Sequence, residues 1–248
     1  MTTKSEPNAV ADRRAVLKQI GMMGAGIVAG SVLASRVASA AAHRRTPEQT
    51  SGPFYPVEDQ DDKDADMTQV GGHSDQALGQ RLLLRGTVID ASTGGAISGA
   101  LVEFWQACAT GRYSHPEDTN TAQLDPNFQY WAQVRSAATG EFSIKTIVPG
   151  AYPAEPTWMR PPHIHVKVTA AGYPSLTTQI YFKGNRYNRE DKILQRLSRS
   201  DQALVIVDPV DSLIPGTGAT ATWSIYLSRF VGLNSLPHVE HIKTPEII

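Results

Sequence analysis

Two histidines in the string R-P-P-H-I-H-V-K-V, residues 160–168, are the residues best spaced for chemistry. Successive side chains of a β-strand point to opposite faces, so His163 and His165 would share one face while Ile164 points to the other. Two imidazoles at this spacing can take adjacent positions on one metal ion, and neutral imidazole binds Fe, Cu, Zn or Ni. The alternative interpretation is a pair of half-buried or surface histidines on a strand.

The remaining ligands of such an ion must come from elsewhere in the chain. The residues after His165 run V-K-V-T and lack the glutamate that normally completes a histidine-rich cupin site. The single cysteine, Cys108, rules out an internal disulfide and a cysteine-rich zinc site. Tyrosine phenolates therefore become candidate donors, and oxygen donors of this kind favour a hard, highly charged ion such as Fe(III).

Strand-like runs dominate the chain after Arg81 and predict the fold that must position these residues. Seven runs have strand length and are rich in β-branched or aromatic residues, and no helical pattern alternates with them. They predict an all-β fold, a two-sheet β-sandwich with long connecting loops and one short helix. That helix is expected at 189–197, where Ile193, Leu194 and Leu197 share a face. The expected strands are 82–89, 100–106, 141–147, 163–169, 177–182, 203–208 and 221–227.

The first forty residues have the anatomy of an export signal. Arg13 and Arg14 precede a charge-free stretch of 17 residues, 19–35, and a small-x-small cleavage site ends at Ala40. Paired arginines before a weakly hydrophobic segment resemble a twin-arginine leader. Because a membrane-spanning helix needs about 20 mostly apolar residues, cleavage is favoured over retention as an anchor. We expect an exported protein, periplasmic or extracellular, with no stable membrane span after leader removal.

Length and charge narrow the class of protein further. The chain has 248 residues, of which 41% are hydrophobic and 19% charged, a balance that excludes disorder, a collagen-like repeat and a coiled coil. Removing residues 1–40 takes away five basic and two acidic residues, which changes the formal net charge from -1 to -4 and disfavours nucleic-acid binding. We expect a leader at 1–40, an extended segment at 41–81 and a β-sandwich catalytic domain at 82–248.

Six motifs follow one another in order along the chain. They are T-S-G-P-F-Y-P from Thr50, W-Q-A-C-A-T-G-R-Y-S-H from Trp105, L-D-P-N-F from Leu124, V-P-G-A-Y-P from Val148, R-P-P-H-I-H from Arg160 and T-Q-I-Y-F from Thr178. In order and spacing they resemble the intradiol ring-cleavage dioxygenases, the family of protocatechuate 3,4-dioxygenase and catechol 1,2-dioxygenase. The resemblance spans about residues 50–230, and ordered motifs are far more specific than any one of them.

The resemblance implies an enzyme with a non-haem Fe(III) cofactor, held by Tyr113, Tyr152, His163 and His165. It implies that O2 cleaves a catecholic ring between its two hydroxylated carbons and gives a muconate-type dicarboxylate. It also implies that the bound catechol displaces Tyr152, which then acts as a general base as well as a ligand.

Two further residues gain roles from the resemblance. Arg160 matches the family arginine that stabilises negative charge developing on the ring, a task that suits an always-charged guanidinium. Gln179 matches a family glutamine near the oxygen-binding side of the iron. Without the motifs, Arg160 would be interpreted as part of a surface ion pair and Gln179 as a polar strand residue that faces solvent.

Departures from the family pattern leave the substrate open. Only ten residues separate Tyr152 from His163, fewer than in the protocatechuate enzymes, and no helical amino-terminal linker like that of catechol 1,2-dioxygenases is visible. Catechol, protocatechuate, hydroxyquinol and larger substituted catechols all fit the sequence. Family members commonly self-associate, so a homo-oligomer is expected. The alternative function is a non-catalytic exported β-sandwich module that binds carbohydrate, protein or another metal such as copper.

Overall fold

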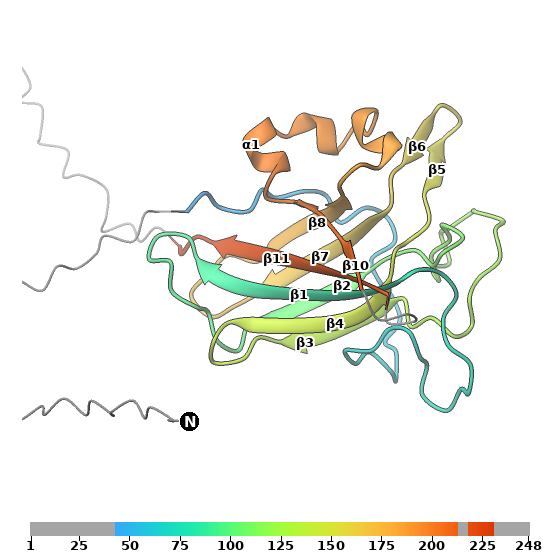
Figure 1. The fold of residues 1–248 in the computed structure, drawn as a ribbon, viewed down its shortest axis with the longest axis horizontal. Coiled ribbons are helices and arrows are strands. Elements are labelled where there is room, and N and C mark those ends of the chain that lie inside the picture. The colour runs from blue at the N-terminus through green and yellow to red at the C-terminus, as the bar shows by residue number, and fades with distance from the viewer. Residues whose placement is uncertain (1–42, 213–217, 231–248) are drawn as a thin grey trace, which may run out of the picture. The chain divides into compact units, whose positions relative to one another are not determined.

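The computed structural model of the chain describes residues 43–212 and 218–230. The predicted leader, residues 1–40, lies outside this described part (Figure 1). Within it, no helix is both long enough and apolar enough to cross a membrane.

Two β-sheets form the framework of the described chain (Figure 1), which confirms the predicted all-β fold. One sheet has four strands in the order β10-β11-β1-β4, and the other has five in the order β3-β2-β7-β8-β9. The strands β5 and β6 form a separate hairpin. The strands are β1 (Arg81–Asp90), β2 (Leu101–Trp105), β3 (Trp131–Arg135), β4 (Glu141–Ile147), β5 (Tyr152–Glu155), β6 (Trp158–Arg160), β7 (His163–Thr169), β8 (Leu176–Phe182), β9 (Ile206–Val207), β10 (Val210–Asp211) and β11 (Ala219–Leu227).

Alternating burial along the strands explains why the two sheets stack. On β1, Leu82, Leu84 and Val88 are buried, while every second residue from Arg81 to Ile89 is more exposed. This is the period of two expected for a strand with one core face. Phe104 of β2 meets Phe142 of β4 between the sheets, with ring centroids 5.7 Å apart. Each fully buried side chain of this kind stabilises the fold by about 1.5–3 kcal/mol.

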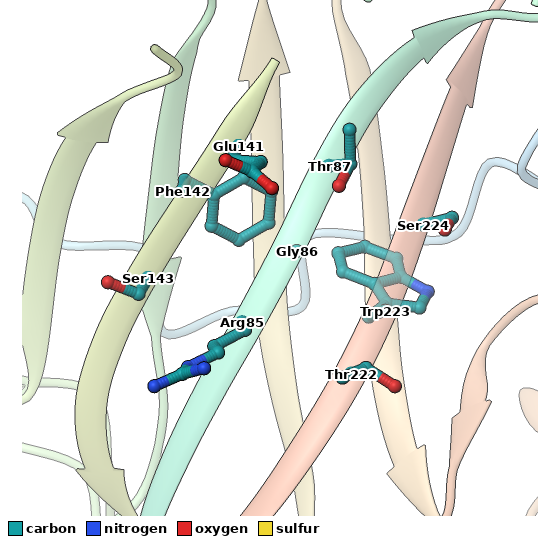
Figure 2. Close-up of a pocket in the computed structure, with 9 residues that line it drawn as sticks. All are labelled: Arg85, Gly86, Thr87, Glu141, Phe142, Ser143, Thr222, Trp223 and Ser224. Carbon is teal, nitrogen blue, oxygen red and sulfur yellow. The ribbon is translucent and has the colours of Figure 1, made fainter. Parts of the chain in front are cut away.

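Gly86 allows two large side chains to pack at the centre of the four-stranded sheet. Figure 2 shows Phe142 of β4 on one side of Gly86 and Trp223 of β11 on the other. A Cβ atom at Gly86 would lie 2.2 Å from Cζ of Phe142, so no larger residue fits without moving the ring.

The described chain has one short α-helix as predicted, but it is α1 (Arg199–Gln202) and not the expected stretch at 189–197. That stretch holds only the last residue of the 3-10 helix η1 (Arg186–Arg189) and the 3-10 helix η2 (Leu194–Arg196). One carboxylate oxygen of Asp191 accepts the backbone N–H groups of Ile193 and Leu194, at 3.1 and 2.7 Å. These bonds start a new turn instead of continuing a helix. Leu194 is nevertheless buried, as its place on the predicted apolar face indicates.

The strand predicted at 203–208 is wrong over most of its length, since only the two residues of β9 pair with β8. The backbone N–H of Val205 donates to the carbonyl of Gln202 at 3.1 Å, a turn bond that follows α1. The Val205 side chain is buried together with Leu194 and Tyr181. The apolar run therefore indicates burial and not a strand.

Four short strands were not predicted, and two of them form the hairpin that carries site residues. The β5-β6 hairpin pairs Tyr152 with Arg160 across its ladder. Pro153 lies inside β5, and two prolines, 161–162, follow β6. Proline depresses strand propensity, so these segments do not look like strands in the sequence. The other two unpredicted strands are β3 and β10.

Residues 43–80 run along the sandwich without helix or strand, apart from an isolated bridge between Asp66 and Lys145. The backbone N–H of Thr46 donates to the carbonyl of Tyr226 at 3.0 Å, and that of Gln49 donates to Thr177 at 2.9 Å. These bonds hold the segment against β11 and the start of β8. The division of the chain into three parts stays a prediction.

Candidate metal centre

β7 carries His163 and His165 side by side, with both side chains buried. The imidazole centroids are 4.8 Å apart and the rings are nearly perpendicular, at 75°. His165 also stacks on Trp105, its cross-strand neighbour on β2, at 4.9 Å and 8°. The strand spacing thus brings the two imidazoles together as the sequence predicts.

Tyr113 lies in a loop and Tyr152 begins β5, and the loops that lead to these two residues approach each other through glycines. Gly111 has a φ of +85°, and a Cβ atom on it would lie 2.5 Å from the carbonyl oxygen of Ala151. A Cβ atom on Gly150 would lie 2.4 Å from the backbone nitrogen of Gly111. Only glycine fits both positions. The close backbone contact places the two tyrosine rings edge to face, 5.6 Å apart.

The structure brings all four predicted ligands into one buried cluster. The Tyr113 hydroxyl oxygen lies 3.3 Å from Nε2 of His163. The Tyr152 ring is 5.7 Å from the ring of His163, and the Tyr113 ring is 6.2 Å from that of His165. Within residues 43–212 and 218–230, no group of three or more His, Cys, Asp or Glu side chains could hold a metal ion. A metal at the cluster would therefore need the phenol oxygens as donors.

Burial favours the neutral form of both histidines, which is the form that binds metals. Nδ1 of His163 lies 2.6 Å from the carbonyl oxygen of Pro161, which places the ring proton on Nδ1 and turns the Nε2 lone pair toward the Tyr113 hydroxyl. Burial, and next the charge of Arg160, lower the pKa of His163 well below its usual value. The same two causes lower the pKa of His165.

The tyrosines show what kind of ion the cluster fits. Burial, followed by the neighbouring Tyr152, raises the pKa of Tyr113 well above its usual value. Burial also raises the pKa of Tyr152, although Arg160 partly offsets the effect. Both phenols therefore stay protonated unless a strong positive charge lies beside them, and a highly charged cation supplies such a charge. The donor set fits a hard trivalent ion.

Arg160 lies beside this cluster and is itself buried, with 3% of its surface exposed. Its Nε donates to a carboxylate oxygen of Asp191 at 2.7 Å, and its Nη2 donates to the side-chain oxygen of Gln179 at 2.6 Å. Asp191 is also fully buried. The ion pair is internal, so the interpretation of Arg160 as part of a surface pair is wrong. Two anchoring bonds fix the orientation of the guanidinium plane.

Gln179 is fully buried, so it does not face solvent. Its side-chain oxygen accepts bonds from Arg160 and from the Tyr181 hydroxyl, the latter at 3.0 Å, and its Nε2 donates to the carbonyl of Thr50 at 2.9 Å. Across the β7-β8 ladder Gln179 is the partner of His165. Gln179 thereby connects Arg160 to the strand that carries the histidines.

Sequence reasoning missed three residues that complete this network, namely Gln49, Tyr181 and Asp191. The Gln49 side chain donates to the Tyr181 hydroxyl at 3.1 Å and accepts the backbone N–H of Gln179 at 3.1 Å. Tyr181 could have been found, because it lies two residues after Gln179 on the same strand face. Nothing in the sequence marks Gln49 or Asp191 as buried.

A cavity of about 580 Å³ opens beside Tyr152 and Arg160. Its volume lies within the ~300–1,000 Å³ that encloses small-molecule ligands. Phe54 and Trp158 contribute aromatic walls, and Asp118 contributes one carboxylate. The cavity therefore connects the predicted metal ligand and the predicted charge-stabilising arginine to a space large enough for an aromatic substrate.

A second hollow, of about 610 Å³, lies on the four-stranded sheet (Figure 2). Strands β1, β4 and β11 line it with Arg85, Glu141 and Thr222 among others. None of the predicted site residues lines it, and its lining contains no histidine, cysteine or tyrosine. We assign the chemistry to the cavity beside Tyr152.

Known proteins that are similar to this chain include named dioxygenases. A family model described as dioxygenase (Dioxygenase_C) matches residues 50–229. The protocatechuate 3,4-dioxygenase beta chain of Burkholderia cepacia is 39% identical over 146 residues, which cover 58% of this chain and 62% of that protein. Catechol 1,2-dioxygenase 2 of Acinetobacter lwoffii is 30% identical over 194 residues, covering 70% and 66% respectively. The chain thus spans less than two thirds of the length of these relatives.

Solved structures show the same fold. Catechol 1,2-dioxygenase from Acinetobacter sp. ADP1 superposes with a TM-score of 0.56 at 28% identity, covering 75% of this chain and 63% of that one. The dioxygenase domain of a dioxygenase carbohydrate-binding protein fusion from Streptomyces sp. SirexAA-E superposes with a TM-score of 0.57 at 27% identity, covering 75% and 99%. With a family match over most of its length and this shared fold, the chain belongs to the intradiol ring-cleavage dioxygenase family.

Proposed function

We propose that this chain is a non-haem Fe(III) dioxygenase that cleaves a catecholic ring between its two hydroxylated carbons. The reaction consumes O2 and gives a muconate-type dicarboxylate. One observation carries the proposal: two phenols and two imidazoles meet in a buried cluster at the edge of a cavity of about 580 Å³. Membership of the intradiol family supports the same reaction.

Tyr113, Tyr152, His163 and His165 would hold the iron. Two phenolates offset much of a triple positive charge, while the imidazoles add neutral donors. Bound ferric iron supplies a Lewis acid that favours the doubly deprotonated catechol and withdraws electron density from its ring.

Tyr152 is placed to handle a substrate proton. Its side chain lines the cavity, so its phenolate oxygen can accept a proton from a catechol hydroxyl. Burial raises the pKa of Tyr152, which favours the protonated phenol once the oxygen is free. Tyr113 is buried and does not line the cavity. We therefore assign the proton to Tyr152.

Arg160 stabilises negative charge on the ring. Arg160 lines the cavity, and Asp191 and Gln179 hold its guanidinium in place. A preorganised cation in a buried site interacts more strongly with developing charge than the same cation in water. Gln179 acts through Arg160 in this assignment, as a positioning residue.

We also infer that the protein is exported as a folded enzyme, to the periplasm or outside the cell, by the twin-arginine leader at 1–40. Arg13 and Arg14 support this location. In the exported form we expect a homo-oligomer that binds neither nucleic acid nor membrane.

Oxygen uptake by the iron-loaded protein with a panel of catechols tests the proposed reaction. We expect uptake of O2 with a product opened between the two hydroxylated carbons, identified by mass spectrometry and NMR. Ring opening beside the hydroxylated carbons, or no uptake with iron bound, would reject intradiol cleavage. A protein that instead holds copper and consumes no O2 would fit the non-catalytic module.

A further inference from the structure

We propose that the cavity beside Tyr152 accepts catechols that carry no ring carboxylate, with hydrogen or an apolar group as the ring substituent. This inference rests on the proposed function and narrows its substrate class. It follows from the charges and the wall chemistry of the cavity.

The cavity offers no free cation to a substrate carboxylate. Of the described residues that line it, Arg160 alone is basic. Arg160 forms a buried ion pair with Asp191, in which the two side chains are 4% and 0% exposed, and its charge is assigned to the ring of the substrate. A carboxylate on the substrate ring would have to leave water without finding a further cation in the cavity. The desolvation of such an unpaired charge is costly.

Asp118 makes the cavity less favourable still for an anion. Its two carboxylate oxygens accept the backbone N–H groups of Tyr113 and Asn120, at 2.7 and 2.9 Å, so the carboxylate is held in place beside the cavity. No lysine or arginine forms an ion pair with Asp118 among the described residues. A substrate carboxylate would therefore enter a site that already contains a fixed negative charge.

Lys192 is near this site but is engaged elsewhere. Its ammonium donates to a carboxylate oxygen of Glu155 at 2.6 Å and lies 4.7 Å above the Trp158 ring. Lys192 does not line the cavity. Its charge is thus paired with Glu155 and lies over the indole, outside the residues that line the cavity.

The walls suit an apolar substituent instead. Phe54, Pro153, Trp158 and Ile193 all line the cavity. Its volume of about 580 Å³ leaves room for an aromatic ring together with an alkyl group or a halogen. Each buried CH2 of such a group would contribute about 0.8 kcal/mol.

The inference differs from what identity to relatives alone would suggest. The relative with 39% identity carries the name of a protocatechuate enzyme, and protocatechuate is a catechol with a ring carboxylate. The cavity of this chain instead favours a catechol without a carboxylate. A measured preference between catechol and protocatechuate therefore shows whether the cavity or the sequence identity is the better guide to the substrate.

Anaerobic calorimetric titration of the iron-loaded protein tests the inference, because binding is then measured without turnover. Catechol, 4-methylcatechol and protocatechuate are the probes. We expect 4-methylcatechol to bind at least as tightly as catechol, and protocatechuate at least about tenfold more weakly, which corresponds to about 1.4 kcal/mol. Protocatechuate binding as tightly as catechol would overturn the inference.

An introduced cation should reverse the preference. Ala154 lines the cavity from β5 and is exposed, so Ala154→Arg can be accommodated, with Ala154→Gln as the neutral control. We expect Ala154→Arg to raise the kcat/KM ratio of protocatechuate to catechol about tenfold relative to Ala154→Gln. Thr119→Arg with Thr119→Gln repeats the test from another wall if the first variant misfolds. An unchanged ratio in a folded arginine variant of each pair would contradict the inference.

The outcomes separate this inference from the proposed function. Cleavage of protocatechuate in preference to catechol would keep intradiol chemistry and reject the substrate class. Failure to cleave any catechol, with the binding preference as expected, would reject the reaction and keep the chemistry of the cavity.

Discussion

The cavity beside Tyr152 and the hollow on the four-stranded sheet have similar volumes, about 580 and 610 Å³, and opposite chemistry. The cavity borders buried phenols, imidazoles and a guanidinium. The sheet hollow (Figure 2) carries exposed polar side chains such as Arg85 and Glu141 above the packed rings of Phe142 and Trp223.

Unpaired polar atoms mark the difference between the two regions. Nδ1 of His165 and Nε1 of Trp158 are buried without a hydrogen-bond partner in the described chain, and both residues belong to the site. No such atom lines the sheet hollow. Leaving one buried polar group unpaired costs about 1–3 kcal/mol. Buried unpaired polar atoms thus occur at the site and not in the sheet hollow, although the two spaces have similar volumes.

Removal of a ligand should have the largest effect. We expect His163→Ala to lose its iron and at least about 10³-fold in kcat/KM, since a metal supplies several kcal/mol of charge stabilisation. Iron content by mass spectrometry and oxygen uptake measure both losses. His73→Ala, at an exposed histidine, is the control and should keep its iron. Full iron content in His163→Ala would remove this residue from the ligand set.

Loss of the ion pair that holds Arg160 should have the next largest effect on activity. Asp191→Asn keeps the shape of the side chain but leaves Arg160 without its counter-charge, and we expect kcat to fall about 10²-fold with iron content unchanged and a smaller change in KM. The free energy of unfolding should fall by about 3 kcal/mol. Asp201→Asn, which removes a more exposed pair with Arg44, is the control and should change stability much less than Asp191→Asn does. Equal effects of the two variants on kcat would show that catalysis does not depend on the ion pair between Asp191 and Arg160.

A change in the sheet hollow should affect stability without affecting chemistry. Gly86→Ala places a Cβ atom against the Phe142 ring, and we expect the free energy of unfolding to fall by about 1–3 kcal/mol. Chemical denaturation measures this loss, and kcat of the folded protein should stay unchanged. Gly95→Ala, at an exposed turn, should stay within about 0.5 kcal/mol of the wild type. A loss of kcat in folded Gly86→Ala would contradict the assignment of catalysis to the cavity alone.

The smallest effect should come from the exposed lining of the sheet hollow. We expect Arg85→Ala to change the free energy of unfolding by less than about 0.5 kcal/mol and to leave kcat/KM unchanged. Steady-state kinetics with a catechol checks this. A clear fall in kcat/KM would show that the hollow takes part in function.

Local patterns predicted the fold class and the histidine pair. The alternation of a strand depends on neighbouring residues alone, so the shared face of His163 and His165 could be read directly. The strand-rich pattern after Arg81 likewise predicted two sheets. Both features follow from short-range geometry.

Contacts between distant segments could not be read from residue types. Tyr113 and Tyr152 meet because two glycine-containing loops touch, and only the resemblance to a family pointed to the pair. Asp191 lies within the stretch predicted to be a helix. Its carboxylate accepts the N–H groups at the start of the next turn, and these bonds interrupt the helix. Such side-chain to backbone bonds compete with helix formation and leave little trace in a hydrophobic pattern.

The visible absorption spectrum of the iron-loaded protein tests the central claim most directly. If Tyr113 and Tyr152 bind Fe(III), phenolate-to-iron charge transfer colours the protein. Replacing either tyrosine by phenylalanine should then shift or weaken the band, while Tyr187→Phe, outside the cluster, should leave it unchanged. A colourless iron-loaded protein, or a spectrum that neither Tyr113→Phe nor Tyr152→Phe alters, would contradict the proposed metal centre.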